Sequence, residues 1–187
     1  MNVWMMRHGE SETNRDGLWT GHLDVRLTEK GKMQAMQAGK FLTGVEFDKV
    51  FSSDLLRAKM TAEFAIPGCR CEFLSALREI DVGSLAGTPY NSLTDEKRKT
   101  TVVHGYSAFG GESKTDFRNR VYGYMKMLEE QECCNIAIFT HAGWMRQFFE
   151  LAVGVPFPKK SICCGNCATA FYEYENGTWK LHSWINL

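Results

Sequence analysis

The sequence lacks an excess of charge of either sign, because its 187 residues carry 22 lysines plus arginines against 22 aspartates plus glutamates. Proteins that bind nucleic acids or anionic membrane surfaces by general attraction need a surplus of basic residues. We therefore expect neither a nucleic acid nor a membrane as a partner, and any cationic site must be local. Hydrophobic residues make up 44% of the chain and charged residues 24%, which is typical of a globular protein.

Long apolar runs are also missing from the sequence. The longest ones, such as residues 136–139, fall far short of the ~20 apolar residues that span a bilayer. The first ten residues lack the basic leader, apolar stretch and small-residue cleavage site of a secretory signal. A cytoplasmic location is the expectation that follows.

The seven cysteines include one C-x-x-C pair, Cys164 and Cys167, and lack a second. An odd number of cysteines without an export signal indicates reduced thiols. A zinc site is one alternative, because this spacing suits a metal and Cys69 and Cys71 could pair with it. The simpler interpretation is that they are small core or loop residues, and we expect no metal.

Repeats, low-complexity tracts and Pro- or Ser-rich linkers are absent, so one domain over residues 1–187 is expected. Apolar strand-like runs alternate with segments of helical period. The predicted strands cover residues 2–6, 49–52, 73–77, 135–140, 168–175 and 178–185. The predicted helices cover residues 28–41, 55–65, 113–131 and 144–153, with a further one possible at 93–100. This alternation predicts an α/β fold of three layers, α/β/α, with a mostly parallel sheet and a late antiparallel hairpin around residues 176–177.

The first predicted helix starts at Thr28, a good capping residue. Met33, Met36, Ala38 and Phe41 recur in it at near-helical spacing, which is the pattern that predicts the helix.

Polar side chains follow three of the predicted strands. Arg7 and His8 follow the first strand, Arg57 comes shortly after the second, and His141 follows strand 135–140. The ligand crevice of an open α/β sheet lies outside the carboxyl ends of its strands, so we expect these side chains in one pocket. Two arginines with two histidines describe an anion site, because the forked donors of arginine match phosphate oxygens.

Two common nucleotide-binding signatures are missing, since neither G-x-x-x-x-G-K-[ST] nor a G-x-G-x-x-G after a strand occurs. Nucleotide binding through such loops is therefore not supported. Backbone N–H groups at the helix starts after Ser53 and Ala142 are instead expected to add to the anion site.

The residues around His8 carry a specific resemblance. Residues 7–14, Arg-His-Gly-Glu-Ser-Glu-Thr-Asn, resemble the signature of the histidine phosphatase superfamily, the phosphoglycerate mutase-like proteins. Further blocks resemble that family in the expected order, at residues 20–31, 52–62, 77–83, 110–113 and 140–143. The resemblance spans nearly the whole chain and implies a phosphoglycerate mutase-like fold, with a small cap inserted at about residues 81–112.

The resemblance also implies a role for each matching residue. His8 would attack phosphorus and form a phosphohistidine, which splits one hard displacement into two. Glu79 would protonate the leaving oxygen and later take a proton from water, and Asp81 is the rival acid two residues away. The residues implied to bind the phosphate are Arg7, Arg57, His141 and Asn14. Those implied to bind the rest of the substrate are Thr20 and Gly21.

The implied enzyme needs no cofactor, because arginine and histidine side chains replace the magnesium of many phosphoryl-transfer enzymes. A phosphatase acting on a small phosphorylated metabolite is favoured over a mutase, since the cap is short and a mutase must exclude water. The chain looks like the short branch that includes alpha-ribazole phosphatase and broad-specificity phosphatases. Cap side chains available to meet a leaving group are Tyr90, His104, Tyr106 and Phe109.

Three alternatives stay open at this point: phosphoglycerate mutase-type phosphoryl transfer, a metal-dependent hydrolase, and a relative that binds phosphorylated ligands without turning them over. The mutases usually carry a longer chain and a Trp just before the Asn, where this sequence has Thr13. The presence of both His8 and Glu79 argues against a non-catalytic relative. The sequence does not indicate an oligomeric state.

Overall fold

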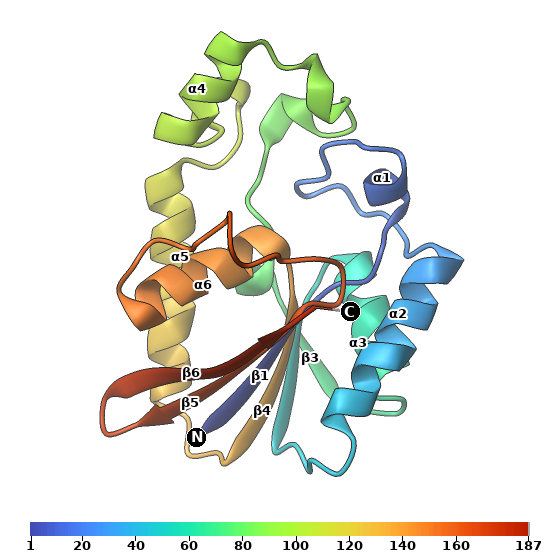
Figure 1. Cartoon of the computed structure of the whole chain (residues 1–187), viewed down its shortest axis with the longest axis vertical. Helices are drawn as coiled ribbons and strands as arrows, with labels where there is room; N and C mark the ends of the chain where they lie inside the picture. The colour runs from blue at the N-terminus through green and yellow to red at the C-terminus, as the bar shows by residue number, and fades with distance from the viewer. Residues whose placement is uncertain (187) are drawn as a thin grey trace.

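The computed structural model describes residues 1–186, in which six strands form one sheet between two pairs of helices (Figure 1). The strands are β1 (Asn2–Arg7), β2 (Lys49–Ser53), β3 (Cys71–Leu74), β4 (Asn135–Thr140), β5 (Thr169–Glu175) and β6 (Thr178–Ile185). They lie in the order β3-β2-β4-β1-β5-β6. The first four of these neighbours pair in parallel, whereas β5 runs antiparallel to both β1 and β6. The predicted α/β fold with a mostly parallel sheet and a late antiparallel hairpin is confirmed.

Each face of the sheet is covered by one pair of helices (Figure 1). Helices α2 (Glu29–Gly39) and α3 (Leu56–Ala65) cover one face, and α5 (Lys114–Glu129) and α6 (Ala142–Val153) cover the other. Two further helices, α1 (Glu12–Arg15) and α4 (Asp95–His104), lie beyond the carboxyl ends of the parallel strands. None of the helices within residues 1–186 has the length and apolar character that crossing a membrane requires.

The parallel strands are apolar on both faces because successive side chains of a strand point to opposite sides. In β4, Ile136 and Ile138 pack into the core cluster that includes α5 and α6. Ala137 and Phe139 pack into the smaller cluster that includes α2 and α3. The continuous apolar run that predicted this strand therefore reflects burial on both sides.

Helix α2 packs through its small residues rather than its methionines. Ala35 and Ala38 are buried, whereas Met33 is 68% exposed. The helix lies close to α3, where a Cβ added to Gly39 would overlap the backbone of Ala65. Such a close approach leaves no space for a long side chain between the two helices. The apolar spacing therefore predicted the helix correctly, but of the residues in that pattern Ala38 is buried and Met33 is exposed.

The third strand differs from its prediction. Strand β3 ends at Leu74, paired with Ser53, and residues 75–77 form a 3₁₀ turn where the sequence predicted a continuing strand. The turn ends beside the carboxyl end of β4, where Thr140 Oγ1 donates to Leu77 O at 2.8 Å, and Glu79 follows it into the pocket described below. Helix α6 also begins earlier than predicted, at Ala142 directly after His141.

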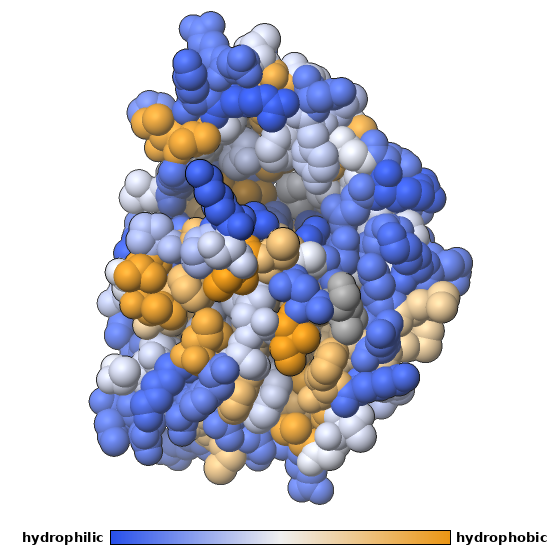
Figure 2. Space-filling model, viewed as in Figure 1, coloured by the Kyte–Doolittle hydropathy of each residue, from blue (hydrophilic) through white to orange (hydrophobic). Residues whose placement is uncertain are grey.

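Residues 81–112, called the cap below, cross above the carboxyl ends of the strands, with α4 at the top of Figure 1. The cap is tied to the loop after α1, because Trp19 N–H donates to Thr88 O at 2.9 Å and Gly87 N–H donates to Trp19 O at 2.7 Å. Val82, Leu85 and other apolar side chains form a small core of their own inside it. Figure 2 shows the surface hollowed between the cap and the body of the molecule.

Candidate active site

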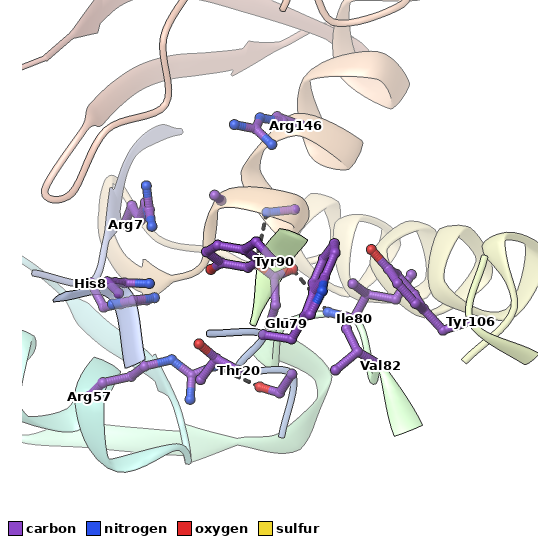
Figure 3. A pocket seen from close by; sticks show the side chains of 15 residues that line it. Arg7, His8, Thr20, Arg57, Glu79, Ile80, Val82, Tyr90, Tyr106 and Arg146 are labelled. Atoms are coloured by element: carbon purple, nitrogen blue, oxygen red, sulfur yellow. Dashed lines mark hydrogen bonds between the residues drawn. The ribbon is translucent and has the colours of Figure 1, made fainter. Parts of the chain in front are cut away.

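A pocket of about 310 Å³ lies under the cap, at the carboxyl ends of β1 and β4 and beside the first turn of α3 (Figure 3). Among the residues that line it are Arg7, His8, Asn14, Thr20, Gly21, Arg57 and Glu79. All the site residues predicted from the sequence are thus brought together except His141, which is fully buried against the pocket. The His141 ring lies edge-on to the His8 ring, with 5.1 Å between the ring centroids.

His8 follows β1 directly and is held as a neutral imidazole. Its Nδ1 lies 2.7 Å from the carbonyl oxygen of Gly9, and a carbonyl can only accept a hydrogen bond. The proton therefore sits on Nδ1, which leaves the lone pair on Nε2. Burial, reinforced by the charges of Arg57 and Arg7, lowers the pKa of His8 well below 6.5.

His141 is neutral for the same reasons, since burial and the charge of Arg57 lower its pKa well below 6.5. Its Nε2 lies 2.9 Å from the Ser53 hydroxyl oxygen, and that oxygen also accepts the Leu55 N–H at 3.3 Å. A hydroxyl group can donate one hydrogen bond and accept two, so this contact fits either neutral tautomer of the His141 ring. Within residues 1–186 the buried Nδ1 of this ring has no hydrogen-bond partner.

Arg57, at the start of α3, is fully buried and still has donors to spare. Its two terminal nitrogens donate to the carbonyls of Leu23 and Gly21, each at 2.8 Å, while its buried Nε has no partner within the described part of the chain. Burial lowers the pKa of Arg57 to about 10, so the group remains charged at neutral pH. Gly21 has a φ of +48°, and a Cβ there would overlap the side chain of Val82. The turn that receives Arg57 therefore requires glycine.

Arg7, at the end of β1, is anchored from the opposite side. Its Nη1 donates to Cys164 O at 2.6 Å, and its buried Nε has no partner among residues 1–186. Burial lowers the pKa of Arg7 as well. Two guanidinium groups with unused donors thus flank the neutral His8.

Sequence reasoning missed a third guanidinium in the pocket, that of Arg146 on α6 (Figure 3). Arg146 makes no hydrogen bond or ion pair with the described residues, and its Nε is buried. Its guanidinium carbon lies 5.8 Å from the centre of the Phe157 ring. Its position four residues after Ala142 would have signalled it, because residues four apart share a helix face and Ala142 also lines the pocket.

Glu79 supplies the carboxylate of the pocket. Its Oε1 accepts the Ile80 N–H at 2.9 Å, and its Oε2 accepts the Gly143 N–H at 3.0 Å. Asp81, the rival acid in the sequence, instead accepts the Gly83 N–H at 2.9 Å and lies outside the pocket lining. With Glu79 as the acidic residue among three arginines, the pocket is locally cationic in a chain of zero net charge.

The prediction that backbone N–H groups at the starts of α3 and α6 add to the anion site is wrong in part. The Gly143 N–H at the start of α6 is occupied by Glu79, and the Leu56 N–H at the start of α3 donates to Asp24 Oδ1 at 2.6 Å. Both carboxylates take the place that an anionic ligand would have at a free helix N-terminus. Side chains rather than these N–H groups are therefore the main donors to the pocket.

Asn14 and Thr20 form one wall. The Asn14 Oδ1 accepts from the Ser11 N–H at 3.3 Å and from Asn166 Nδ2 at 3.1 Å, which leaves the Asn14 amide nitrogen as the group for a ligand. The Thr20 hydroxyl lies 2.6 Å from the Thr13 hydroxyl. Both predicted residues thus present polar atoms that are fixed by their neighbours.

Aromatic side chains form the mouth of the pocket. Trp19 meets Tyr90 edge-to-face at 4.9 Å and Tyr106 at 5.8 Å between ring centroids. Burial raises the pKa of Tyr106 to about 12, so its phenol stays protonated and can donate. Of the other two cap residues, His104 is exposed and Phe109 packs against the cap's own core.

A second hollow of about 520 Å³ adjoins the pocket and shares part of its lining, including Trp19, Tyr106 and Arg146. Lys114 and Lys159 also line this hollow, together with apolar side chains such as Leu93. A group attached to a phosphate in the pocket therefore has room to extend between α4 and α6.

Within residues 1–186 no group of three His, Cys, Asp or Glu side chains is arranged to hold a metal ion. All seven cysteines carry free thiols, and both Cys164 and Cys167 are buried. Burial raises the pKa of Cys164 to about 11 and of Cys167 to about 12.

Comparison with known proteins gives concordant matches. The family described as "Histidine phosphatase superfamily (branch 1)" matches residues 3–187. A "Probable phosphoglycerate mutase GpmB" from Salmonella paratyphi A is 30% identical over 194 residues, which cover 99% of this chain and 90% of that protein. The structure of a "putative alpha-ribazole-5'-P phosphatase" from Escherichia coli K-12 superposes with a TM-score of 0.85 at 26% identity, covering 100% of this chain and 96% of the other. A phosphoglycerate mutase structure from Thermus thermophilus gives a TM-score of 0.76 at 28% identity, covering 100% and 99%.

Proposed function

The chain belongs to the histidine phosphatase superfamily and is an enzyme of that family, and we propose that it hydrolyses a small phosphomonoester through a phosphohistidine on His8. One observation carries the proposal: the buried His8 is neutral, with Nδ1 held by Gly9 O and Nε2 left with its lone pair between two arginines. A nitrogen nucleophile must be unprotonated, and this arrangement keeps it so at physiological pH.

In the first step the Nε2 lone pair of His8 forms a bond to phosphorus while the bond from phosphorus to the leaving oxygen breaks. Arg7 and Arg57 donate to the non-bridging phosphoryl oxygens through the N–H groups that the protein leaves unused. In the proposed complex the unpaired Nδ1 of His141 carries the proton of the ring, so that this N–H and the amide of Asn14 add neutral donors to the same group. These side chains supply the charge stabilisation that magnesium gives in other phosphoryl-transfer enzymes, and the proposed reaction needs no metal.

Glu79 is the proposed acid and base. The cycle starts from the protonated form of Glu79, which gives its proton to the leaving oxygen in the first step and becomes the carboxylate. In the second step water attacks the phosphohistidine, the nitrogen–phosphorus bond breaks, and Glu79 takes the proton of the water. Inorganic phosphate leaves, and both His8 and Glu79 return to their starting states.

Hydrolysis rather than transfer to a second substrate is favoured by the shape of the site. A mutase must keep water away from its phosphoenzyme. Here the pocket continues into the hollow under a cap of 3₁₀ turns and the ten-residue helix α4. The same hollow gives space for the leaving group. Thr20 and Gly21 line the pocket itself and are the proposed contacts of the substrate. Phosphoglycerate mutase-type transfer is the second candidate, because a relative and a similar structure carry that name.

The test is turnover of p-nitrophenyl phosphate by the wild type and by His8→Asn, each with and without EDTA. We expect activity in the wild type that EDTA does not change, and loss of about three orders of magnitude or more in His8→Asn. Activity that EDTA removes contradicts the proposed chemistry, and so does a fully active variant. Mutase activity on 3-phosphoglycerate above the rate of its hydrolysis would favour the second candidate.

A further inference from the structure

The segment that carries Glu79 has no regular secondary structure, and Arg120 on α5 makes more hydrogen bonds to its backbone than any other side chain does. Further contacts to it come from Thr140 Oγ1, which donates to Leu77 O at 2.8 Å, from Trp144 Nε1, which donates to Ala76 O at 3.0 Å, and from the ion pair of Arg78 with Asp54. The Arg120 Nη1 donates to the carbonyls of Ala76 at 3.0 Å and Arg78 at 2.8 Å. Its Nη2 donates to the carbonyl of Glu79 itself at 3.1 Å. Three carbonyls within four residues of chain are therefore fixed by one guanidinium.

Arg120 is in turn fixed by Glu112, at the end of the cap. The Arg120 Nε donates to Glu112 Oε1 at 2.9 Å and the Arg120 Nη2 donates to Glu112 Oε2 at 2.8 Å, which is a bidentate ion pair. Together with the three carbonyls, this pair uses all five N–H donors of the guanidinium. The side chains are 21% and 15% exposed, and the Arg120 guanidinium also lies 5.0 Å from the centre of the Phe117 ring.

The same carboxylate ties the cap to the Glu79 segment. The Glu112 N–H donates to Asp81 O at 2.9 Å, and the Asp81 N–H donates to Glu112 Oε2 at 3.4 Å. The chain on both sides of Glu79 is thus held by the Arg120–Glu112 pair, on one side through carbonyls and on the other through Asp81. His22 Nε2 adds a further hydrogen bond to Glu79 O at 2.8 Å.

We propose that Arg120, held by Glu112, is a positioning residue that sets the place of the Glu79 carboxylate relative to the leaving oxygen. The inference rests on the proposed role of Glu79 as the acid. A general acid acts only within hydrogen-bond reach of the oxygen that it protonates, and a displacement of about 1 Å costs up to ~10²-fold in rate. Lysine does not replace arginine here, because its three donors on one nitrogen cannot hold the carboxylate and the three carbonyls together.

The dependence of the rate on the basicity of the leaving group distinguishes a misplaced acid from a smaller fraction of folded enzyme. A nitrophenolate leaves without needing a proton, whereas the phenolate of a more basic phenol leaves slowly unless an acid protonates it. A misplaced Glu79 therefore penalises esters of basic phenols and spares p-nitrophenyl phosphate. A smaller fraction of folded enzyme lowers the rates of both by the same factor.

The experiment measures kcat/KM for a series of aryl phosphates, from p-nitrophenyl phosphate to p-methoxyphenyl phosphate, in the wild type, Arg120→Lys and Glu112→Gln. The readout is the slope of log kcat/KM against the pKa of the leaving phenol. We expect both variants to steepen the slope, with p-methoxyphenyl phosphate losing roughly 10- to 100-fold more activity than p-nitrophenyl phosphate. Arg118→Lys, on the exposed side of the same helix, is the matched control and keeps the wild-type slope. Should Arg120→Lys fail to fold, the slope of Glu112→Gln decides the matter.

The double variant Glu79→Gln/Arg120→Lys separates this inference from the proposed function. We expect Glu79→Gln alone to give a steep slope that Arg120→Lys does not steepen further. A steep slope for Glu79→Gln with wild-type slopes for Arg120→Lys and Glu112→Gln overturns the positioning role and leaves the acid role intact. A wild-type slope for Glu79→Gln overturns the acid role and the positioning role together.

Discussion

The Glu79 carboxylate accepts the backbone N–H of Gly143 at 3.0 Å, although the two residues are 64 positions apart in the chain. The contact joins the segment before the cap to the first turn of α6. A Cβ on Gly143 would overlap Glu79 Oε1, so the carboxylate keeps its present place only with glycine at residue 143. The proposed acid and the helix that follows His141 are therefore coupled through one position without a side chain.

Gly143→Ala is expected to displace the Glu79 carboxylate and lower kcat/KM on aryl phosphates by about 10²-fold, with the strongest loss for basic leaving groups. The loss is measured as kcat/KM in steady-state kinetics with p-nitrophenyl phosphate and with p-methoxyphenyl phosphate. Gly123→Ala is the matched control, because a Cβ at that helical position meets nothing within 4 Å. The control keeps its activity and gains about 0.5–1 kcal/mol of unfolding free energy from alanine's higher helix propensity. Full activity of Gly143→Ala would contradict the coupling.

Arg146→Gln is expected to raise KM more than it lowers kcat. The guanidinium has no partner within the described chain, so its donors are free for the substrate, and it lies where the pocket meets the adjoining hollow. Loss of a charged hydrogen bond of about 1.5–3 kcal/mol corresponds to a tenfold or greater change in KM. Arg118→Gln, exposed on α5, is the control that keeps the wild-type KM. A variant that loses kcat with an unchanged KM would place Arg146 in the chemical step instead.

The buried histidines make the folded state sensitive to acid. The folded-state pKa values of His8 and His141 lie well below 6.5, so the unfolded chain binds protons at these residues first as the pH falls. The stability contributed by each neutral histidine is therefore present above pH 6.5 and declines as the pH falls below it. Acidification from about pH 7.5 to pH 5.5 is therefore expected to lower the free energy of unfolding by on the order of 1 kcal/mol for each of the two residues.

Urea unfolding at these two pH values measures the effect in the wild type, His8→Asn and His104→Asn. We expect His8→Asn to lose less stability on acidification than the wild type does. His104 is exposed, so its variant is expected to follow the wild type. Equal losses in the wild type and His8→Asn would show that His8 is not held neutral in the folded state.

Much of the sheet and of the site could be predicted from local pattern. Apolar runs placed the strands, and the turn at Asn176-Gly177, with positive φ at both residues, marked the hairpin. Arg7, His8 and Arg57 lie in one pocket because parallel strands end at the same edge of the sheet. A local rule was sufficient in each of these cases.

Contacts that depend on the path of the cap could not be predicted in this way. The Arg120–Glu112 pair joins a helix to the end of the cap. Its carbonyl partners at residues 76, 78 and 79 lie in or directly after a 3₁₀ turn that the sequence suggested to be a strand. Met33 was misleading because the close packing of two helices, rather than periodicity, decides which face of α2 is buried. Long-range geometry of this kind leaves no signal in the spacing of residues.

The account's central claim is a covalent intermediate on His8, and the stereochemical course at phosphorus tests it most directly. The measurement uses a phosphomonoester made chiral with oxygen isotopes and an alcohol acceptor in place of water. Two in-line displacements, onto His8 Nε2 and then onto the acceptor, predict net retention of configuration at phosphorus. Inversion would mean a single direct displacement and would contradict the phosphohistidine mechanism.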